Sequence, residues 1–167
     1  MAPRPRTTPR PSRNREGRGA LVLRAHHLLC ALGFRGLGYS PEFVANMTRV
    51  VRALRRRPGR MVRLVDTPDA ICRACPNLRG GRCRPAAGGR SRVPTRDRKV
   101  LRRLGLKPGA SLTARAAYAL IRARITPEDL GREFCAGCRW VALGYCEEGL
   151  AVLRAGASMS ASRRRPA

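Results

Sequence analysis

The stretch ICRACPNLRGGRC, residues 71–83, places three cysteines at the spacing C-x2-C-x7-C. The stretch FCAGCRWVALGYC, residues 134–146, repeats that spacing, and both stretches carry a glycine two residues before the last cysteine. Glycine lets the backbone turn back toward a common centre, and two thiolates separated by two residues can converge on one metal from a tight loop. The duplicated pattern predicts two related metal half-sites that staple a small domain.

Each half-site supplies three ligands, whereas tetrahedral thiolate sites usually need four. The half-sites are Cys72, Cys75 and Cys83 in the first stretch, and Cys135, Cys138 and Cys146 in the second. The chain has seven cysteines and two histidines, so the missing ligands have few sources: Cys30, His26 and His27. His26 and His27 are four and three positions from Cys30, on one flank of a predicted helix. We therefore expect Cys30 to complete one site and His26 or His27 to be available to the other. In the alternative, Cys30 is a small buried apolar residue and each histidine is hydrogen-bonded near a turn, the reading we favour for the histidines.

Iron–sulfur clusters and zinc both accept thiolates, and the spacing differs from the C-x2-C-x2-C run of bacterial ferredoxins. Phe134, Trp140 and Tyr145 surround the second set of cysteines. Their rings would shield an oxygen-sensitive cluster from water, or they form ordinary local core. We expect an iron–sulfur cluster, one or two per chain, with zinc as the alternative.

Helical patterns dominate the rest of the chain. Apolar residues recur at helical spacing from Leu21 to Leu32, with Gly33 as a stop, and again after the Ser40-Pro41 cap. We expect further helices over 95–106 and 112–125, capped by Thr95 and Thr113, and over 147–153. We also expect a short helical turn after Thr67, a longer one after Thr126, and an extended segment at 61–66. The predicted fold class is mainly α, with little or no sheet.

The chain is strongly basic, with a formal net charge of +26 over 167 residues. We expect three parts: a disordered basic arm over 1–19, a cysteine-rich domain over 20–154 and a disordered basic tail over 155–167. A surplus of arginine attracts polyanions such as nucleic acid, or it reflects coding bias.

The chain has no run of about 18 apolar residues that would span a membrane and no secretory signal at its start. We therefore expect a cytoplasmic protein without a membrane partner, in which paired cysteines are more often metal ligands than disulfides. The acidic residues are dispersed, and the glycine-rich stretches lack the spacing of a nucleotide-binding loop. The sequence shows no catalytic constellation.

Six segments resemble domain-of-unknown-function family 1284, short bacterial and archaeal proteins regarded as iron–sulfur binding. They are LRAHHLLC (23–30), GLGYSPEFVANM (36–47), VRLVDTPDAIC (62–72), CPNLRGGRC (75–83), ITPEDL (125–130) and GYCEEGL (144–150). The resemblance spans residues 20–152 and implies an iron–sulfur role for the cysteines. The arginine-rich ends depart from the family pattern, so a nucleic-acid role would belong to this chain alone.

Two functions remain open. The first is a metal-cluster protein that carries electrons or senses oxidants, with a redox protein as its partner. The second is a zinc-stabilised basic module whose arginines bind nucleic acid non-specifically.

Overall fold

The computed structural model describes residues 19–84 and 93–156, so the basic arms expected over 1–19 and 155–167 fall almost entirely outside the described residues. The elements are β1 (Leu21–Arg24), α1 (Ala25–Gly33), α2 (Pro41–Arg56), β2 (Met61–Val65), η1 (Cys72–Ala74), β3 (Leu78–Arg79), β4 (Arg82–Cys83), α3 (Val93–Arg103), β5 (Ser111–Thr113), α4 (Ala114–Arg124), α5 (Pro127–Asp129), η2 (Leu130–Phe134), η3 (Val141–Leu143) and α6 (Tyr145–Arg154). The mainly α class is confirmed.

Three short strands form a small sheet in the order β1-β2-β5. β1 is parallel to β2, with Leu23 opposite Leu64, and β5 is antiparallel to β2 on its other side. Along β2, Val62 and Leu64 are fully buried while Met61 and Arg63 are exposed, the alternation of a half-buried strand. The extended segment expected at 61–66 is thus confirmed. It pairs with a strand on each side, although little or no sheet was expected.

The first predicted helix begins later than its apolar spacing suggested. Leu21–Arg24 is strand β1, and α1 starts at Ala25. Pairing with β2 buries Leu23 and Arg24, and such tertiary pairing overrides a local helical pattern. The expectation of helix over these four residues is wrong.

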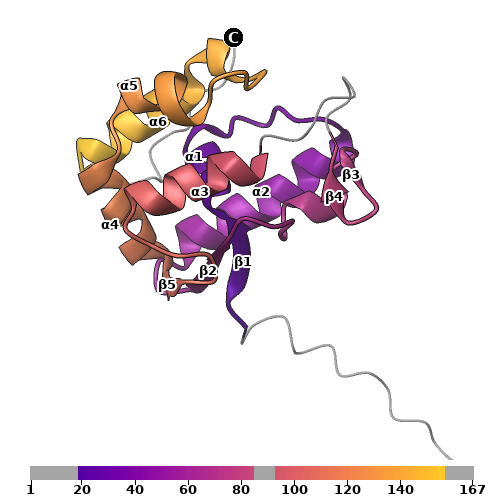
Figure 1. The fold of residues 1–167 in the computed structure, drawn as a ribbon, viewed down its shortest axis with the longest axis horizontal. Helices are drawn as coiled ribbons and strands as arrows, with labels where there is room; N and C mark the ends of the chain where they lie inside the picture. Colours follow the sequence, from indigo (N-terminus) through magenta and orange to yellow (C-terminus); the bar gives the residue numbers. More distant parts are fainter. Residues whose placement is uncertain (1–18, 85–92, 157–167) are drawn as a thin grey trace, which may run out of the picture.

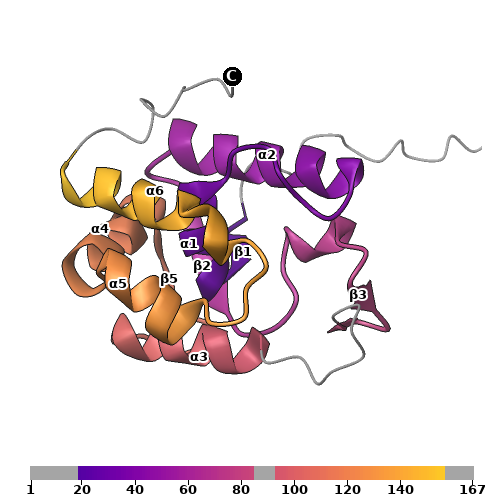
Figure 2. The same ribbon diagram turned by 90° about the horizontal axis from the view of Figure 1, so that it is seen from above.

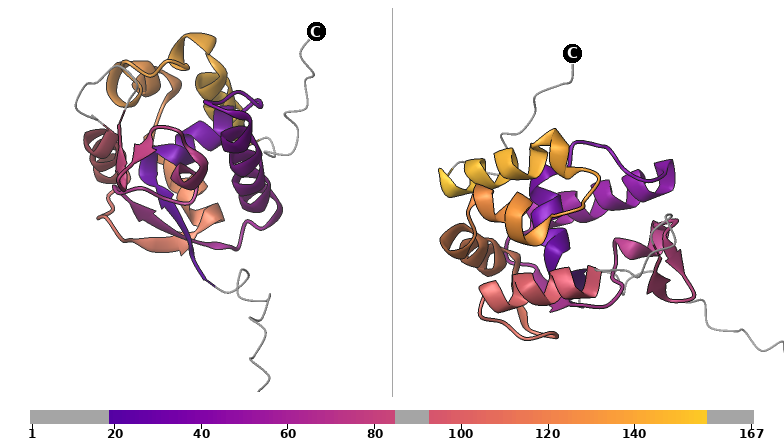
Figure 3. Two further views of the ribbon diagram at one scale, coloured as in Figure 1. Left: turned by 90° about the vertical axis from the view of Figure 1, so that its right-hand side faces the viewer. Right: turned by 45° about the horizontal axis from the view of Figure 1, so that its top comes forward.

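α1 forms the centre of the molecule. Seven of its nine residues are buried, as expected for a helix that is apolar on nearly every side. Figure 2 shows α1 between α2 on one side and α3 on the opposite side, with α4, α5 and α6 gathered along a third. The views in Figure 3 show the same arrangement. Side chains on α1 can therefore meet residues from several distant parts of the sequence.

Most helix starts follow the predicted capping chemistry. Ser40 Oγ accepts a hydrogen bond from the Phe43 N–H at the start of α2, and Thr113 Oγ1 accepts one from the Ala116 N–H at the start of α4. These bonds satisfy backbone donors that the first helical turn leaves without partners. Thr95, expected to cap a helix, instead lies inside the first turn of α3, which begins at Val93.

The cysteine hairpin β3–β4 stands apart from the C-terminal helices. It is a two-stranded ribbon in which Leu78 pairs with Cys83, and it lies at the edge of the molecule opposite α5 and α6 (Figure 1). Within residues 19–84 and 93–156, no helix combines the length and the apolar character needed to cross a membrane.

Candidate metal centre

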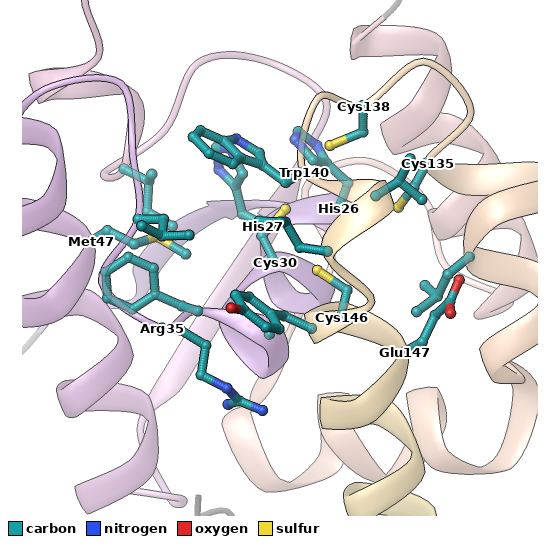
Figure 4. A pocket seen from close by; sticks show the side chains of 18 of the residues that line it. His26, His27, Cys30, Arg35, Met47, Cys135, Cys138, Trp140, Cys146 and Glu147 are labelled. Carbon is teal, nitrogen blue, oxygen red and sulfur yellow. The ribbon is translucent and has the colours of Figure 1, made fainter. Parts of the chain in front are cut away.

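Four cysteines from separate parts of the chain line one cavity: Cys30, Cys135, Cys138 and Cys146. Cys30 is on α1, Cys135 and Cys138 lie in the turn after η2, and Cys146 is in the first turn of α6. Figure 4 shows their sulfur atoms directed toward a common space, with Trp140 beside it. The structure thus brings together the second cysteine stretch and the one cysteine that lies outside both stretches.

Close packing of α1 against α6 positions two of these thiols. A Cβ added to Gly33 would lie 2.5 Å from the Cys146 backbone nitrogen and 2.7 Å from its Sγ, and one added to Gly149 would lie 2.4 Å from the Leu32 carbonyl oxygen. Both positions therefore require glycine. Gly144, at φ +68°, begins α6 from a left-handed conformation, which glycine adopts without strain.

A compact turn positions the other two thiols. The Cys138 N–H donates to the Cys135 carbonyl at 2.8 Å, and the Val141 N–H donates to the Cys138 carbonyl at 3.1 Å. The Cys135 N–H donates to the Leu130 carbonyl at 2.6 Å, which ties the turn to the end of η2. This local hydrogen bonding is what a C-x2-C spacing needs to present two sulfurs on one side.

The cavity that the four thiols line, together with residues from several other elements, is mostly apolar. Its volume is about 130 Å³, several times the roughly 10–15 Å³ that one water requires. Phe43, Met47 and Trp140 lie along its walls, and Leu37 and Leu143, both partly exposed, lie at its mouth. A space of this size and lining suits a group of several atoms.

The spacing of the thiols is wider than a single zinc ion requires. With Zn–S bonds of about 2.3 Å, a tetrahedral site holds its sulfurs about 3.8 Å apart. Among the described residues, the one group of three candidate ligands whose atoms all lie within 4.8 Å of one another is His27, Asp69 and Cys72. The four thiols around the cavity form no such group, and a multi-atom cluster separates its ligands further than one ion does.

Burial favours the protonated form of three of these thiols, those of Cys30, Cys135 and Cys146. It raises the pKa of Cys135 to about 12 and that of Cys146 to about 11, with neighbouring thiols adding to both shifts. The pKa of Cys30 is raised well above its usual value, first by burial and then by the other three thiols. Four thiolates in this place would need the positive charge of a bound metal group.

Ile71 of the first cysteine stretch lines the cavity, but the three cysteines of that stretch, Cys72, Cys75 and Cys83, do not. Burial raises the pKa of Cys75, and a hydrogen bond from the Asn77 backbone N–H partly opposes this rise. The nearby thiol of Cys83 raises the pKa of Cys75 further, so Cys75 and Cys83 are neighbours. Cys72 is buried beside Asp69 and Arg24. Metal binding by this stretch stays a prediction.

Both carboxylate oxygens of Asp69 have two hydrogen-bonding partners each. Its Oδ1 accepts from the N–H groups of Ile71 at 3.0 Å and Cys72 at 2.9 Å, and its Oδ2 accepts from the Arg24 N–H at 2.7 Å. His27 Nδ1 also lies 2.7 Å from Oδ2. A carboxylate offers about four lone pairs, and all are used. The Asp69 carboxylate of this compact group therefore holds the loop before η1 in place.

A buried ionic network beside the cavity was not predicted. Asp97, fully buried on α3, accepts from Arg24 Nε at 2.7 Å and lies 2.6 Å from His26 Nδ1. Burial raises the pKa of Asp97, but the hydrogen bond from His26 and the charge of Arg24 outweigh it and lower that pKa. Burial, with a smaller contribution from His27, lowers the pKa of His26 to about 4. His26 is thus neutral, with the Nδ1 proton donated to Asp97.

Both histidines, considered above as ligands, therefore have a carboxylate at Nδ1. The two rings are adjacent, with centroids 4.3 Å apart, and both line the cavity. A hydrogen bond at one ring nitrogen fixes the orientation of the other. The histidines are held in place as walls of the thiol cavity.

A family model described as "Protein of unknown function (DUF1284)" matches residues 38–144. The matched region contains the first cysteine stretch together with Cys135 and Cys138, whereas Cys30 and Cys146 lie just beyond its two ends. No curated protein and no solved structure matches the chain.

Proposed function

This chain belongs to the DUF1284 family, whose function is unknown, and from its own cysteines we propose that it binds an iron–sulfur cluster. The proposed ligands are Cys30, Cys135, Cys138 and Cys146. Four cysteine thiolates are the usual ligand set of such clusters. The proposal assigns the cavity to the cofactor and leaves the hairpin cysteines outside this site.

One observation carries the proposal: four thiols from α1, the turn after η2 and α6 converge on a space too large for a single ion. Their wide spacing supports a cluster over a mononuclear zinc site.

The surrounding residues would protect and tune the bound group. Trp140, Phe43 and Met47 exclude water from the cavity walls, and solvent exclusion is one determinant of cluster potential. Arg96 lies close enough to lower the pKa of Cys30 and Cys135 against the effect of burial, so its charge favours thiolate. When bound, the cluster would supply one-electron redox chemistry.

Two cellular roles fit such a site, electron transfer and the sensing of oxidants. The mouth of the cavity has the exposed side chains of Leu37 and Leu143. A partner protein or a small oxidant can approach the cofactor there. Both roles require the cluster, so its presence is the first matter to test.

The test is anaerobic purification followed by absorption spectroscopy and elemental analysis of iron, sulfide and zinc. We expect a brown protein that absorbs between ~300 and 600 nm and contains matched iron and sulfide. A colourless protein loaded with zinc would overturn the proposal, because zinc is spectroscopically silent. That outcome would favour the zinc-stabilised basic module.

A further inference from the structure

Exposed apolar side chains gather at the mouth of the thiol cavity. Within residues 19–84 and 93–156, four large apolar side chains are exposed: Leu37, Tyr39, Met61 and Leu143. Three of them, all but Met61, line the thiol cavity. Single exposed apolar residues are normal on a protein surface, whereas a group of them marks a place where another molecule binds. We call Leu37, Tyr39 and Leu143 the mouth patch.

The mouth patch is built from two distant parts of the chain. Leu37 and Tyr39 lie between α1 and α2, and Leu143 is the last residue of η3. The Tyr39 ring packs edge-on against Phe43 and Trp140, with centroid distances of 5.2 and 5.7 Å. Such edge-to-face contacts are favourable, and here they hold the two parts together. The patch is therefore a surface that the folded chain fixes in place.

A cofactor bound by the four thiols would leave the mouth patch uncovered. The sulfur atoms of Cys30, Cys135, Cys138 and Cys146 are directed toward a common space inside the cavity (Figure 4), whereas the three side chains of the patch are exposed to solvent. The same cavity is lined by both sets of side chains. A molecule seated on the patch would therefore lie next to the cofactor without displacing it.

The charge of the chain determines which kind of partner can approach. A formal net charge of +26 repels basic proteins and attracts acidic ones over long range. Beside the patch, the exposed Arg139 places its guanidinium carbon 5.8 Å from the centre of the Tyr39 ring. Arg139 forms no ion pair with any acid in the part of the chain that the structure describes. Two acids are nearby, Glu147 in the cavity lining and Glu148, which pairs with Arg35.

We propose that the mouth patch is the docking surface for an acidic electron-carrier protein. The inference rests on the proposed cluster and names the partner of that site. One electron passes from the reduced cluster to the oxidised carrier, so the cluster is oxidised and the carrier is reduced, and no bond forms or breaks. Transient redox complexes have small interfaces, with an apolar centre and a polar rim. Leu37, Tyr39 and Leu143 form the centre, and Arg139 belongs to the rim.

The test measures electron transfer from the full chain, purified without oxygen, after its cluster has been reduced with dithionite and the excess removed. The oxidised acceptors are plastocyanin, an acidic copper protein, and cytochrome c, a basic haem protein. Stopped-flow absorption gives the second-order rate constant per bound cluster. At low salt we expect plastocyanin to react faster than cytochrome c, and added salt should slow plastocyanin and not cytochrome c, because salt screens attraction between opposite charges.

Substitutions in the patch locate the docking surface. Leu37→Ser and Leu143→Ser should each lower the rate constant with plastocyanin about tenfold, because each removes an apolar side chain that docking buries. Met61→Ser is the matched control, since Met61 is also exposed but does not line the cavity, and its rate should be unchanged. Arg139→Gln should lower the rate about threefold at low salt. Arg56→Gln removes the same charge from the exposed end of α2 and should have little effect.

Equal rate constants for Leu37→Ser and Met61→Ser would overturn the proposal, as would a faster reaction with cytochrome c. It would also fail if Leu37→Ser abolished binding to anionic phospholipid vesicles, or dissociated a dimer, while leaving the plastocyanin rate unchanged. Failure of the proposed function looks different, because the native protein would then show no visible absorption at all. Should Leu37→Ser lose its iron, Arg139→Gln decides, because Arg139 lies outside the cavity lining.

Discussion

The substitution Asp97→Asn should destabilise the protein far more than its small change in shape suggests. Asp97 is completely buried and holds Arg24, which is 1% exposed, together with the backbone and ring of His26. Asparagine keeps the volume but removes the negative charge. Arg24 would then be a buried cation without an anion, which water cannot reach.

The expected cost follows from this geometry. Removing one partner of a buried ion pair costs about 3–5 kcal/mol, a large share of the roughly 5–15 kcal/mol that stabilises a typical domain. Asp66→Asn is the matched control, because the Asp66 carboxylate pairs with Arg98, whose side chain is 68% exposed. Exposed pairs contribute about 0–1 kcal/mol.

The assay is urea denaturation monitored by circular dichroism, with the free energy of unfolding compared among the native protein and the two variants. We expect Asp97→Asn to lose at least about 2 kcal/mol more than Asp66→Asn. Equal losses for the two variants would refute the reasoning that Asp97 is a buried counter-ion.

Three further predictions concern the cavity, the pH dependence and a helix cap. Gly33→Ala should lower the metal content, because the new Cβ would clash with Cys146. Gly59→Ala should keep the metal, because the space around Gly59 is open. Iron analysis of both variants checks this. The pKa of His26 is lowered from 6.5 to about 4, so the unfolded chain binds a proton at this residue more readily than the folded chain. The free energy of unfolding should therefore be highest above pH 6.5 and fall by roughly 3 kcal/mol as the pH drops toward 4. Urea midpoints that stay constant over that range would contradict the assignment of His26 as neutral. Ser40→Ala should cost about 1 kcal/mol through loss of the α2 cap, and an unchanged thermal midpoint would show that the cap contributes nothing.

Local chemistry explains which parts of the fold could be predicted. The caps at Ser40 and Thr113 depend on neighbouring residues, so a short window of sequence contains them. The strand at Leu21–Arg24 could not be recognised in the same way, because its extended form depends on pairing with a segment some forty residues further along the chain. The apolar residues there fit a helix equally well.

The candidate site likewise combines features that a short window of sequence contains with features that depend on distant residues. The C-x2-C spacing identified Cys135 and Cys138 as a pair, but which stretch Cys30 joins is decided by how α1 packs against α6. A signal for the buried network was present in the sequence: Asp97 precedes Val100 and Leu101 by three and four residues, which puts an acid on the apolar face of α3. Its partner Arg24 could not be singled out among so many arginines.

The most direct test of the proposed cluster compares the iron content of Cys30→Ser and Cys83→Ser, both purified without oxygen. Each variant removes one thiol, but only Cys30 lines the cavity. The account predicts that Cys30→Ser loses iron, sulfide and the visible absorption while Cys83→Ser keeps them. Full iron in Cys30→Ser, or its loss from Cys83→Ser alone, would contradict the assignment of the cluster to Cys30, Cys135, Cys138 and Cys146.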